Sequence, residues 1–268
     1  MKYFTSTKQE TTNTTILLVN KMDLCRYFDK IYYINLEEDF KKRKYFETEI
    51  QKSTFLSKSC KRYEAVMGKN LDIRLIPESI VTTKAKNDVI AKKQKLYGIS
   101  LTYGSLACAL SHNLIYQECQ NSNKPFFLLE DDVVIYDNFD ENLSNLLDQI
   151  EQNGLSFDIL YLGYNEIPGF QKKVINDFVS RPRGLITGLY GYIISNTGAK
   201  KLLDYIFPLY KQIDSCISDN ADKFDLLCAT HKILDVNISF GSKTQMDASC
   251  KNAYSHNTEY SEWYKLFQ

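Results

Sequence analysis

The stretch "KPFFLLEDDVVIYDNF", residues Lys124–Phe139, places three consecutive carboxylates between two apolar runs. The residues before the acids are predicted to form a buried strand, because they are apolar and rich in β-formers. Side chains alternate along a strand, so a chain extended through Asp132 would point Glu130 and Asp132 to one side and Asp131 to the other. Acidic clusters at strand ends also occur in ordinary solvated turns. The flanking "FFLL" and "VVIY" lack Gly, Pro and Ser, which favours a site inserted into a sheet.

Length and charge exclude some classes of protein. The chain has 268 residues, of which 44% are hydrophobic, so it can bury the core of one large α/β domain or two small ones. It carries 33 basic and 33 acidic residues, and its formal net charge is zero. A nucleic-acid-binding protein needs a basic face, and this composition gives no electrostatic support for one.

The cysteines favour a reducing compartment. The chain has seven, and none forms a C-x-x-C pair. An odd, scattered set disfavours a zinc site or a disulfide framework and predicts reduced thiols. No apolar run approaches the ~18 residues of a membrane span, and the N-terminal run 16–19 is too short for a secretory signal. We therefore expect a cytoplasmic protein and leave peripheral attachment to a membrane open.

The pattern along the chain predicts one domain over residues 30–268, preceded by a polar arm over 1–29 that contains "TSTKQETTNTT". Strands and helices alternate, which predicts an α/β fold with a mixed, mostly parallel sheet. Strands are expected in "IYYINL", "KRYEAV", "PFFLLE", "FDILYLG", "LITGLYGYIIS" and "DVNISFG". Helices are expected in "EEDFKKRKYFETEIQK", "LTYGSLACALSHNLIYQECQN", "DENLSNLLDQIEQNG" and "NTGAKKLLDYIF", the last capped by Asn196 or Thr197.

The position of the acidic cluster indicates a ligand-binding or metal-binding role. In open α/β sheets, ligands bind at the carboxyl ends of the strands. Hard oxygen ligands suit Mg²⁺ or Mn²⁺, which keep positions free for water and substrate phosphates. Glu130 and Asp132 are therefore predicted metal ligands. Asp132 is expected to bind the ion directly, with Glu130 or Asp131 acting through water or a ribose.

Several segments carry a resemblance to a known family. "LLEDDV" resembles the metal-binding strand of glycosyltransferase family 25, which includes lipopolysaccharide and collagen glycosyltransferases. Other segments resemble the family's motifs in the family's order and cover roughly residues 31–250. They are "YYINLEEDFKKRKYF", "YEAVMGKNL", "LTYGSLACALSH", "FDILYLG", "YGYIISNTGAKKLLDYI" and "QIDSCI". Departures are Met67 for a usual Asp, Ser105 for Glu, Ala107 for Gly and Gln212 for Pro, which bear on specificity more than on fold.

The resemblance implies a GT-A-like domain that moves a hexose, galactose or glucose, from a UDP-sugar with Mn²⁺ or Mg²⁺. The acceptor would be a hydroxyl of a glycan, lipooligosaccharide or glycoprotein. The family is thought to invert the anomeric centre, which calls for a carboxylate base. Asp214 matches the family's Asp and is our first candidate, although an Asp there could equally cap a helix. Glu166 is the second candidate.

Other residues are predicted to bind the nucleotide sugar. Asn35 ends the first strand, where a base or ribose would be held, but such a residue also suits a strand-end turn. Ser111 and His112 stand in a family motif, although a lone histidine on a helix is more often packed. Lys42 and Arg43 could reach a diphosphate, or belong to an exposed charged helix face. Gly188 and Gly191 would let backbone approach a ligand, or accommodate a bulge.

Two rival functions remain. A non-catalytic sugar- or nucleotide-binding relative would explain Met67 and Ser105 as drift in a lapsed enzyme. A metal-dependent nucleotidyl or phosphoryl transferase would also use paired carboxylates. The absence of a Gly-rich phosphate loop with Lys disfavours this second rival.

Overall fold

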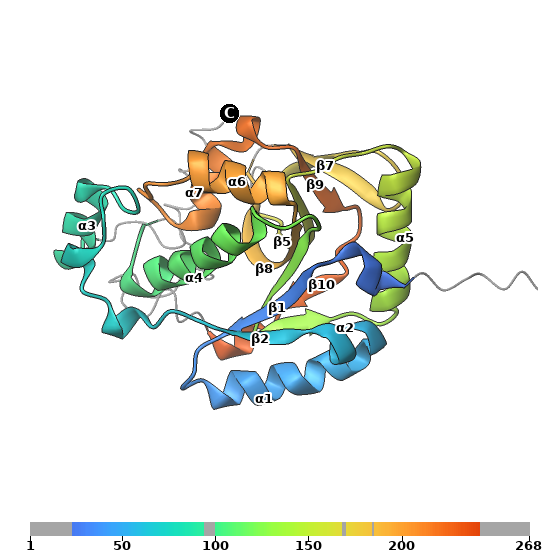
Figure 1. Cartoon of the computed structure of the whole chain (residues 1–268), viewed down its shortest axis with the longest axis horizontal. Coiled ribbons are helices and arrows are strands. Elements are labelled where there is room, and N and C mark those ends of the chain that lie inside the picture. Colours follow the sequence, from blue (N-terminus) through green and yellow to red (C-terminus); the bar gives the residue numbers. More distant parts are fainter. Residues whose placement is uncertain (1–22, 94–99, 168–169, 184, 242–268) are drawn as a thin grey trace, which may run out of the picture.

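The computed structural model describes residues 23–93, 100–167, 170–183 and 185–241. Within these residues one large sheet crosses the molecule (Figure 1). Its strands are β1 Lys30–Asn35, β2 Lys61–Glu64, β3 Phe126–Glu130, β5 Ile159–Asn165, β6 Gln171–Val174, β7 Val179–Arg183, β8 Thr187–Ile194 and β9 Leu226–Ala229. They are arranged in the order β2-β1-β3-β8-β5-β9-β7-β6. β8 and β7 run against the other six described strands, which confirms the predicted mixed and mostly parallel sheet.

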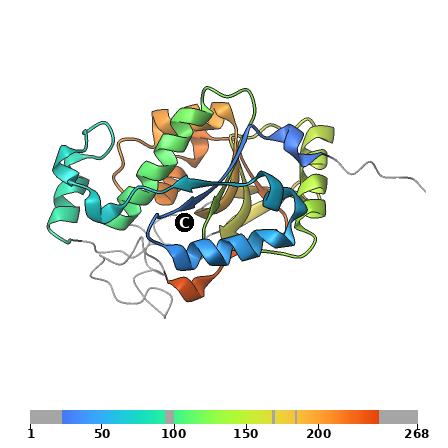
Figure 2. The same cartoon turned by 60° about the horizontal axis from the view of Figure 1, so that its bottom comes forward.

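Helices cover both faces of this sheet. They are α1 Phe40–Glu49, α2 Thr54–Ser59, α3 Thr83–Ile90, α4 Tyr103–Cys119, α5 Phe139–Gln152, α6 Asn196–Tyr205 and α7 Ile213–Asp219. α3, α4, α6 and α7 contribute to one apolar core, and α1, α2 and α5 contribute to the other. Figures 1 and 2 show the two groups on opposite sides of the strands, with α1 running beside β1 and β2. The arrangement is that of a GT-A-like domain.

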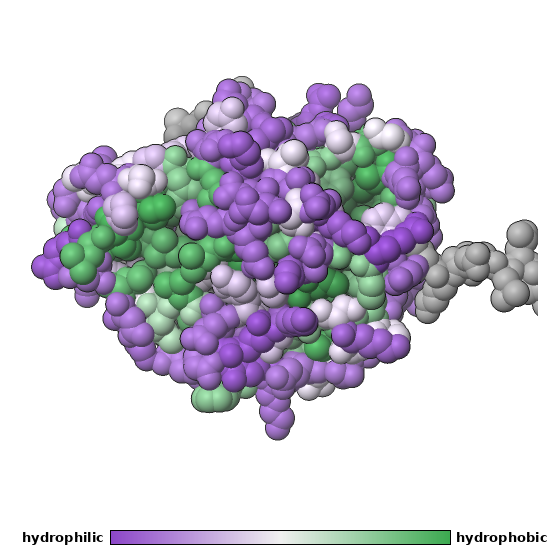
Figure 3. Space-filling model, in the orientation of Figure 1, coloured by the Kyte–Doolittle hydropathy of each residue, from purple (hydrophilic) through white to green (hydrophobic). Residues whose placement is uncertain are grey.

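The central strands supply both cores by simple alternation. In β3, Phe126 and Leu128 face the α4 side, whereas Phe127 and Leu129 face the α5 side, and each is at most 1% exposed. A strand with helices on both faces must be apolar throughout, which is why this segment has no polar alternate positions. Figure 3 shows an apolar area over α4 and another at the upper right of the same face, with hydrophilic side chains between them.

A second, two-stranded sheet lies beyond the end of β3. It pairs β4 Val133–Ile135 with β10 Leu234–Val236 in antiparallel fashion. The run "VVIY" therefore forms a strand of its own and does not continue β3. Asn237, just after β10, donates its backbone N–H to the carbonyl of Asp132 at 2.7 Å. This contact fixes the acidic turn against the late part of the chain.

Two local predictions differ from the structure, and one hairpin was not predicted. The side-chain cap of α6 is Ser195, whose Oγ accepts from the N–H of Gly198, and not Asn196 or Thr197. "DVNISFG" is a strand only to Val236, because Ile238–Phe240 form a 3-10 helix. The hairpin β6–β7 was not predicted, since the lysine-rich strand β6 has no apolar alternation. Of the predicted arm, residues 1–22 lie outside the described residues, and Leu24 and Phe28 pack into the core.

Candidate active site

The acidic cluster forms where β3 stops. β3 ends at Glu130, and Asp131 and Asp132 form the turn that leads into β4. The expected alternation therefore does not extend to Asp132. Ile34 of β1 pairs with Glu130 of β3 in parallel register, so Asn35 reaches the same edge as the two aspartates. Carboxyl ends of neighbouring parallel strands converge here, as the fold class predicts for a ligand site.

Lys42 neutralises the two aspartates. Its Nζ lies 2.7 Å from Oδ2 of Asp132 and 3.3 Å from Oδ1 of Asp131, and the residue is only 8% exposed. Lys42 and Phe46 share the buried face of α1, four residues apart. Burial alone would lower the pKa of the Lys42 ammonium, but Asp132 and Asp131 outweigh burial and raise it. Of the two alternatives for Lys42, the exposed charged helix face is wrong, because the side chain is buried against Asp131 and Asp132.

Asp131 is held by a second set of contacts. Asn35 is 1% exposed, and its Nδ2 donates to Oδ2 of Asp131 at 2.7 Å. The Asn35 Oδ1 in turn accepts from Nε of Arg43 at 3.0 Å and from Nε of Arg62 at 3.1 Å. These contacts use the polar atoms of Asn35 within the protein. Asn35 and Arg43 therefore fix the orientation of Asp131.

Asp132 keeps one oxygen without a partner. Its Oδ1 is buried and has no hydrogen-bond partner among the described residues, whereas Oδ2 pairs with Lys42. Burial and the nearby charge of Glu130 raise the pKa of Asp132 to about 6, against the opposing effect of Lys42. An unpaired buried carboxylate oxygen costs stability unless something fills its place. Lys42 pairs with neither Asp132 Oδ1 nor the Glu130 carboxylate. These anionic oxygens are the kind of ligand that a hard divalent cation prefers.

Glu130 lies next to His112. The Nε2 of His112 is 3.8 Å from Oε1 of Glu130, whose side chain is 32% exposed. The other ring nitrogen, Nδ1, is 2.8 Å from the hydroxyl of Tyr192. Tyr192 lies on β8, the neighbour of β3, so the sheet itself places this hydroxyl behind His112.

Asp214 lies in the first turn of α7 and is only partly buried. Its Oδ1 accepts from the N–H of Ser215 at 2.8 Å, and its Oδ2 accepts from the N–H of Gly188 at 3.3 Å. Gly188 has φ +91°, a backbone conformation that glycine adopts without strain. Burial raises the pKa of Asp214 to about 6, although both N–H groups oppose the shift and Glu130 adds to it. The structure thus brings together two predicted site residues, Gly188 and Asp214.

Two predicted residues have other surroundings. Glu166 is exposed just after β5 and pairs with Lys172 at 3.8 Å. The Oγ of Ser111 is buried, accepts from the N–H of Val66 and donates to the carbonyl of Ala107, each at 2.9 Å. The Ser111 hydroxyl therefore joins α4 to the segment after β2.

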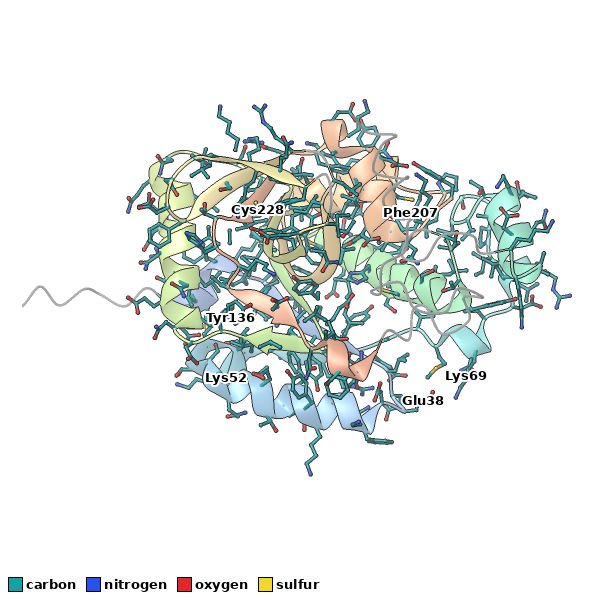
Figure 4. The ribbon with its side chains drawn as sticks, turned by 180° about the vertical axis from the view of Figure 1, so that it is seen from behind. Glu38, Lys52, Lys69, Tyr136, Phe207 and Cys228 are labelled. Carbon is teal, nitrogen blue, oxygen red and sulfur yellow. The ribbon has the colours of Figure 1, made fainter. Side chains whose placement is uncertain are left out.

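One exposed ion pair links the segment after β1 to the segment after β2. Glu38, after β1, forms an ion pair with Lys69 in the 3-10 helix Gly68–Asn70. Figure 4 shows the two residues at the same edge of the molecule.

Three residues near the site were not singled out from the sequence: Arg62, Cys108 and Tyr192. Cys108 stands four residues before His112, one helical turn away.

Comparison with known proteins is consistent with this geometry. The model of "Glycosyltransferase family 25 (LPS biosynthesis protein)" matches residues 28–217. Procollagen galactosyltransferase 1-A of Xenopus laevis is 28% identical over 244 residues, which are 87% of this chain and 36% of that protein. Procollagen galactosyltransferase 2 of Homo sapiens is 29% identical over 188 residues, which are 66% of this chain and 27% of that protein.

Other relatives carry a different description. The protein named inactive glycosyltransferase 25 family member 3 of Homo sapiens is 31% identical over 112 residues, which are 40% of this chain and 18% of that protein. The chain thus spans about a third or less of the length of these curated relatives. The family model covers well over half of this chain, from the first strand to α7. The chain therefore belongs to glycosyltransferase family 25.

Proposed function

We propose that this chain transfers a hexose, galactose or glucose, from a UDP-sugar to a hydroxyl of a glycan, lipooligosaccharide or glycoprotein. Family membership supports the reaction class, and the names of the galactosyltransferase relatives support galactose. The observation that carries the proposal is the free, buried Oδ1 of Asp132 beside the Glu130 carboxylate, at the end of a central strand. A divalent cation there, Mn²⁺ or Mg²⁺, would neutralise the diphosphate leaving group.

The protein's own residues have distinct roles in this proposal. Glu130 and Asp132 hold the cation, and Lys42 balances the remaining negative charge of the cluster. Asn35 and Arg43 orient Asp131 and keep its carboxylate from turning away. Asp214 accepts the proton of the acceptor hydroxyl in an inverting displacement, since its partly buried carboxylate has a pKa raised to about 6.

A lapsed relative that binds a nucleotide sugar without transferring it is the second candidate. Its support is that some matching relatives are named as inactive family members. The two candidates differ in turnover. Incubation with a panel of UDP-sugars and Mn²⁺ should release UDP if the chain is a transferase, whereas binding without UDP release would identify the lapsed relative.

The metal assignment has a sharper test. Asp132→Ala removes a free oxygen, so it should abolish most of the UDP release that depends on the divalent ion. Asp131→Ala should do less, because both oxygens of Asp131 are already engaged by Asn35 and Lys42. Circular dichroism must show that both variants are folded. Near-normal activity in both would contradict the assignment.

We also propose that the protein works in a reducing, cytoplasmic setting. The six cysteines within the described residues are all free, which is typical of such compartments. No helix among the described residues is long and apolar enough to span a membrane.

A further inference from the structure

Three side chains with metal-binding atoms meet beside the acidic turn. Cys108 and His112 lie four residues apart on α4, and Glu130 ends β3. One ligand atom from each, a thiol sulfur, an imidazole nitrogen and a carboxylate oxygen, lies within 4.8 Å of the others. Residues four apart on a helix share a face, so the sequence places the sulfur and the imidazole together without help from a loop.

One ring nitrogen of His112 belongs to this cluster and has no hydrogen-bond partner among the described residues. His112 is 1% exposed, and its Nε2 has no hydrogen-bond partner among the described residues. Glu130 Oε1 is the nearest charged atom, at 3.8 Å, which is too long for a hydrogen bond. A buried ring nitrogen without a partner costs free energy, and a bound ion would remove that cost.

The other side of the ring is fixed. Nδ1 of His112 lies 2.8 Å from the Tyr192 hydroxyl, which lies 2.8 Å from the Tyr116 hydroxyl. If Tyr192 donates to Tyr116, its oxygen accepts the N–H of Nδ1, and Nε2 then carries the free lone pair. Metal-binding histidines are usually held by a hydrogen bond to the second ring nitrogen in this way.

The three donors differ in kind from the neighbouring oxygens. Sulfur, imidazole nitrogen and one carboxylate suit Zn²⁺, whereas the oxygens of the acidic turn suit Mg²⁺ or Mn²⁺. Atoms bound to one tetrahedral zinc lie about 3.5 Å apart, so the cluster must close slightly. The Glu130 side chain is 32% exposed, against 1% for His112, so it has room to make that adjustment.

We propose that Cys108, His112 and Glu130 form a site for a zinc-type divalent cation, distinct from the hard-cation site of the aspartates, with a fourth position open to water. The site does not rest on the proposed transferase function, because it is defined by its ligands. It shares Glu130 with the expected hard-cation site. Binding of a zinc-type ion therefore withdraws Glu130 from the acidic turn.

Cobalt(II) titration of the reduced protein tests the site without an activity assay. A thiolate ligand gives Co²⁺ a sulfur-to-metal charge-transfer absorption, and Zn²⁺ should displace the Co²⁺ and abolish the band. Cys108→Ser should remove the band while leaving the fold intact. Tyr192→Phe should keep the band but weaken Co²⁺ binding by about 10–100-fold, the usual effect of losing an outer contact. Glu130→Gln, which loses a direct ligand, should also keep the band and should weaken binding at least as much.

Matched controls lie outside the cluster. Cys60→Ser alters another partly exposed thiol, and His231→Gln alters a histidine on a different part of the chain. Both variants should bind Co²⁺ as the parent does. Absence of the band in the parent protein, or a band that persists in Cys108→Ser, would overturn the proposal. The Cys108 and Glu130 variants test the site without altering the buried ring of His112.

Discussion

Lys42 shows how one side chain sets the charge of the whole acidic turn. Among the residues that the structure describes, it is the only basic group within 4 Å of either Asp131 or Asp132. Removing one partner of a buried ion pair leaves the other charge uncompensated. The stability of this region should therefore depend on Lys42 far more than on the exposed lysines beside it.

The substitution Lys42→Met tests this dependence. It keeps the apolar stem but removes the ammonium, and it should lower the free energy of unfolding by about 3–5 kcal/mol. Urea unfolding followed by circular dichroism measures the loss. Saturating Mn²⁺ should restore more stability to Lys42→Met than to the parent, since a cation can then occupy the vacated place. Lys41→Met, at an exposed neighbouring position, is the control. Equal losses in both variants would contradict the role given to Lys42.

Asp214 is the residue on which the chemistry depends most directly. Asp214→Asn keeps the shape but removes the proton acceptor, so sugar transfer should fall by about 10²–10⁴-fold. The raised pKa, about 6, predicts that the parent rate rises with pH through this value and is level above it, because only the ionised carboxylate acts as a base. Initial rates measured from about pH 5 to about pH 8 give both effects.

Asp219→Asn is the matched control for this experiment. Asp219 lies on the same helix, but its carboxylate pairs with Lys211 and Tyr210. This variant should transfer sugar at the parent rate. A parent-like rate in Asp214→Asn would instead exclude Asp214 as the base and make Glu166 the next residue to test.

Helix α6 is positioned by a close approach that only glycine permits. A Cβ on Gly198 would lie 2.1 Å from the carbonyl oxygen of Asp158, just before β5. The carbonyl also accepts the N–H of Ser195 at 3.1 Å, and the Asp158 carboxylate pairs with Lys201 at 2.6 Å. The first turn of α6 is therefore seated directly on the backbone of the sheet.

Gly198→Ala should destabilise the protein in spite of alanine's better helix propensity. Alanine gains about 1 kcal/mol in a helix. A clash with rigid backbone is at the upper end of the ~1–3 kcal/mol that overpacking costs, so the net loss should be about 2 kcal/mol. Thermal or urea unfolding gives the value. Lys200→Ala, at an exposed site on the same helix, should change stability by less than about 0.5 kcal/mol. A Gly198→Ala protein as stable as the parent would show that α6 can move away from β5.

Elements with a strong local pattern could be predicted from the sequence, and those defined by distant partners could not. β3 and α5 follow from an apolar run and from amphipathic spacing ended by Gly154, whose φ is +59°. The hairpin β6–β7 pairs through backbone at the sheet edge, where lysines are tolerated and no apolar alternation is needed.

The site residues divide in the same way, into those with a local sequence signal and those defined by distant partners. The acids were visible because they interrupt an apolar run of sequence, and Asp214 was visible only through family resemblance. The buried ion pair of Lys42 could not be predicted, because its partner Asp132 is 90 residues away in sequence. Cys108 was not singled out, because the sequence was searched for zinc ligands in C-x-x-C pairs. Glu130, which lies near Cys108 in the fold, also comes from a different element. Burial and long-range pairing arise only when β1 and β3 are placed side by side.

The distribution of thiols gives a test of the whole fold and of its compartment. Cys25 is exposed, whereas Cys119, Cys216 and Cys228 are buried, and burial raises the pKa of these three thiols. A thiolate-specific reagent should therefore label Cys25 quickly in the native protein, and the buried three only as the structure opens. Peptide mapping by mass spectrometry identifies the labelled positions, and Cys25→Ser should lose the fast phase.

In denaturant, all six described cysteines should react without prior reduction. Disulfide-linked peptides would contradict the proposed reducing compartment, and equal native labelling of Cys25 and Cys119 would contradict the packing of α4 against β8.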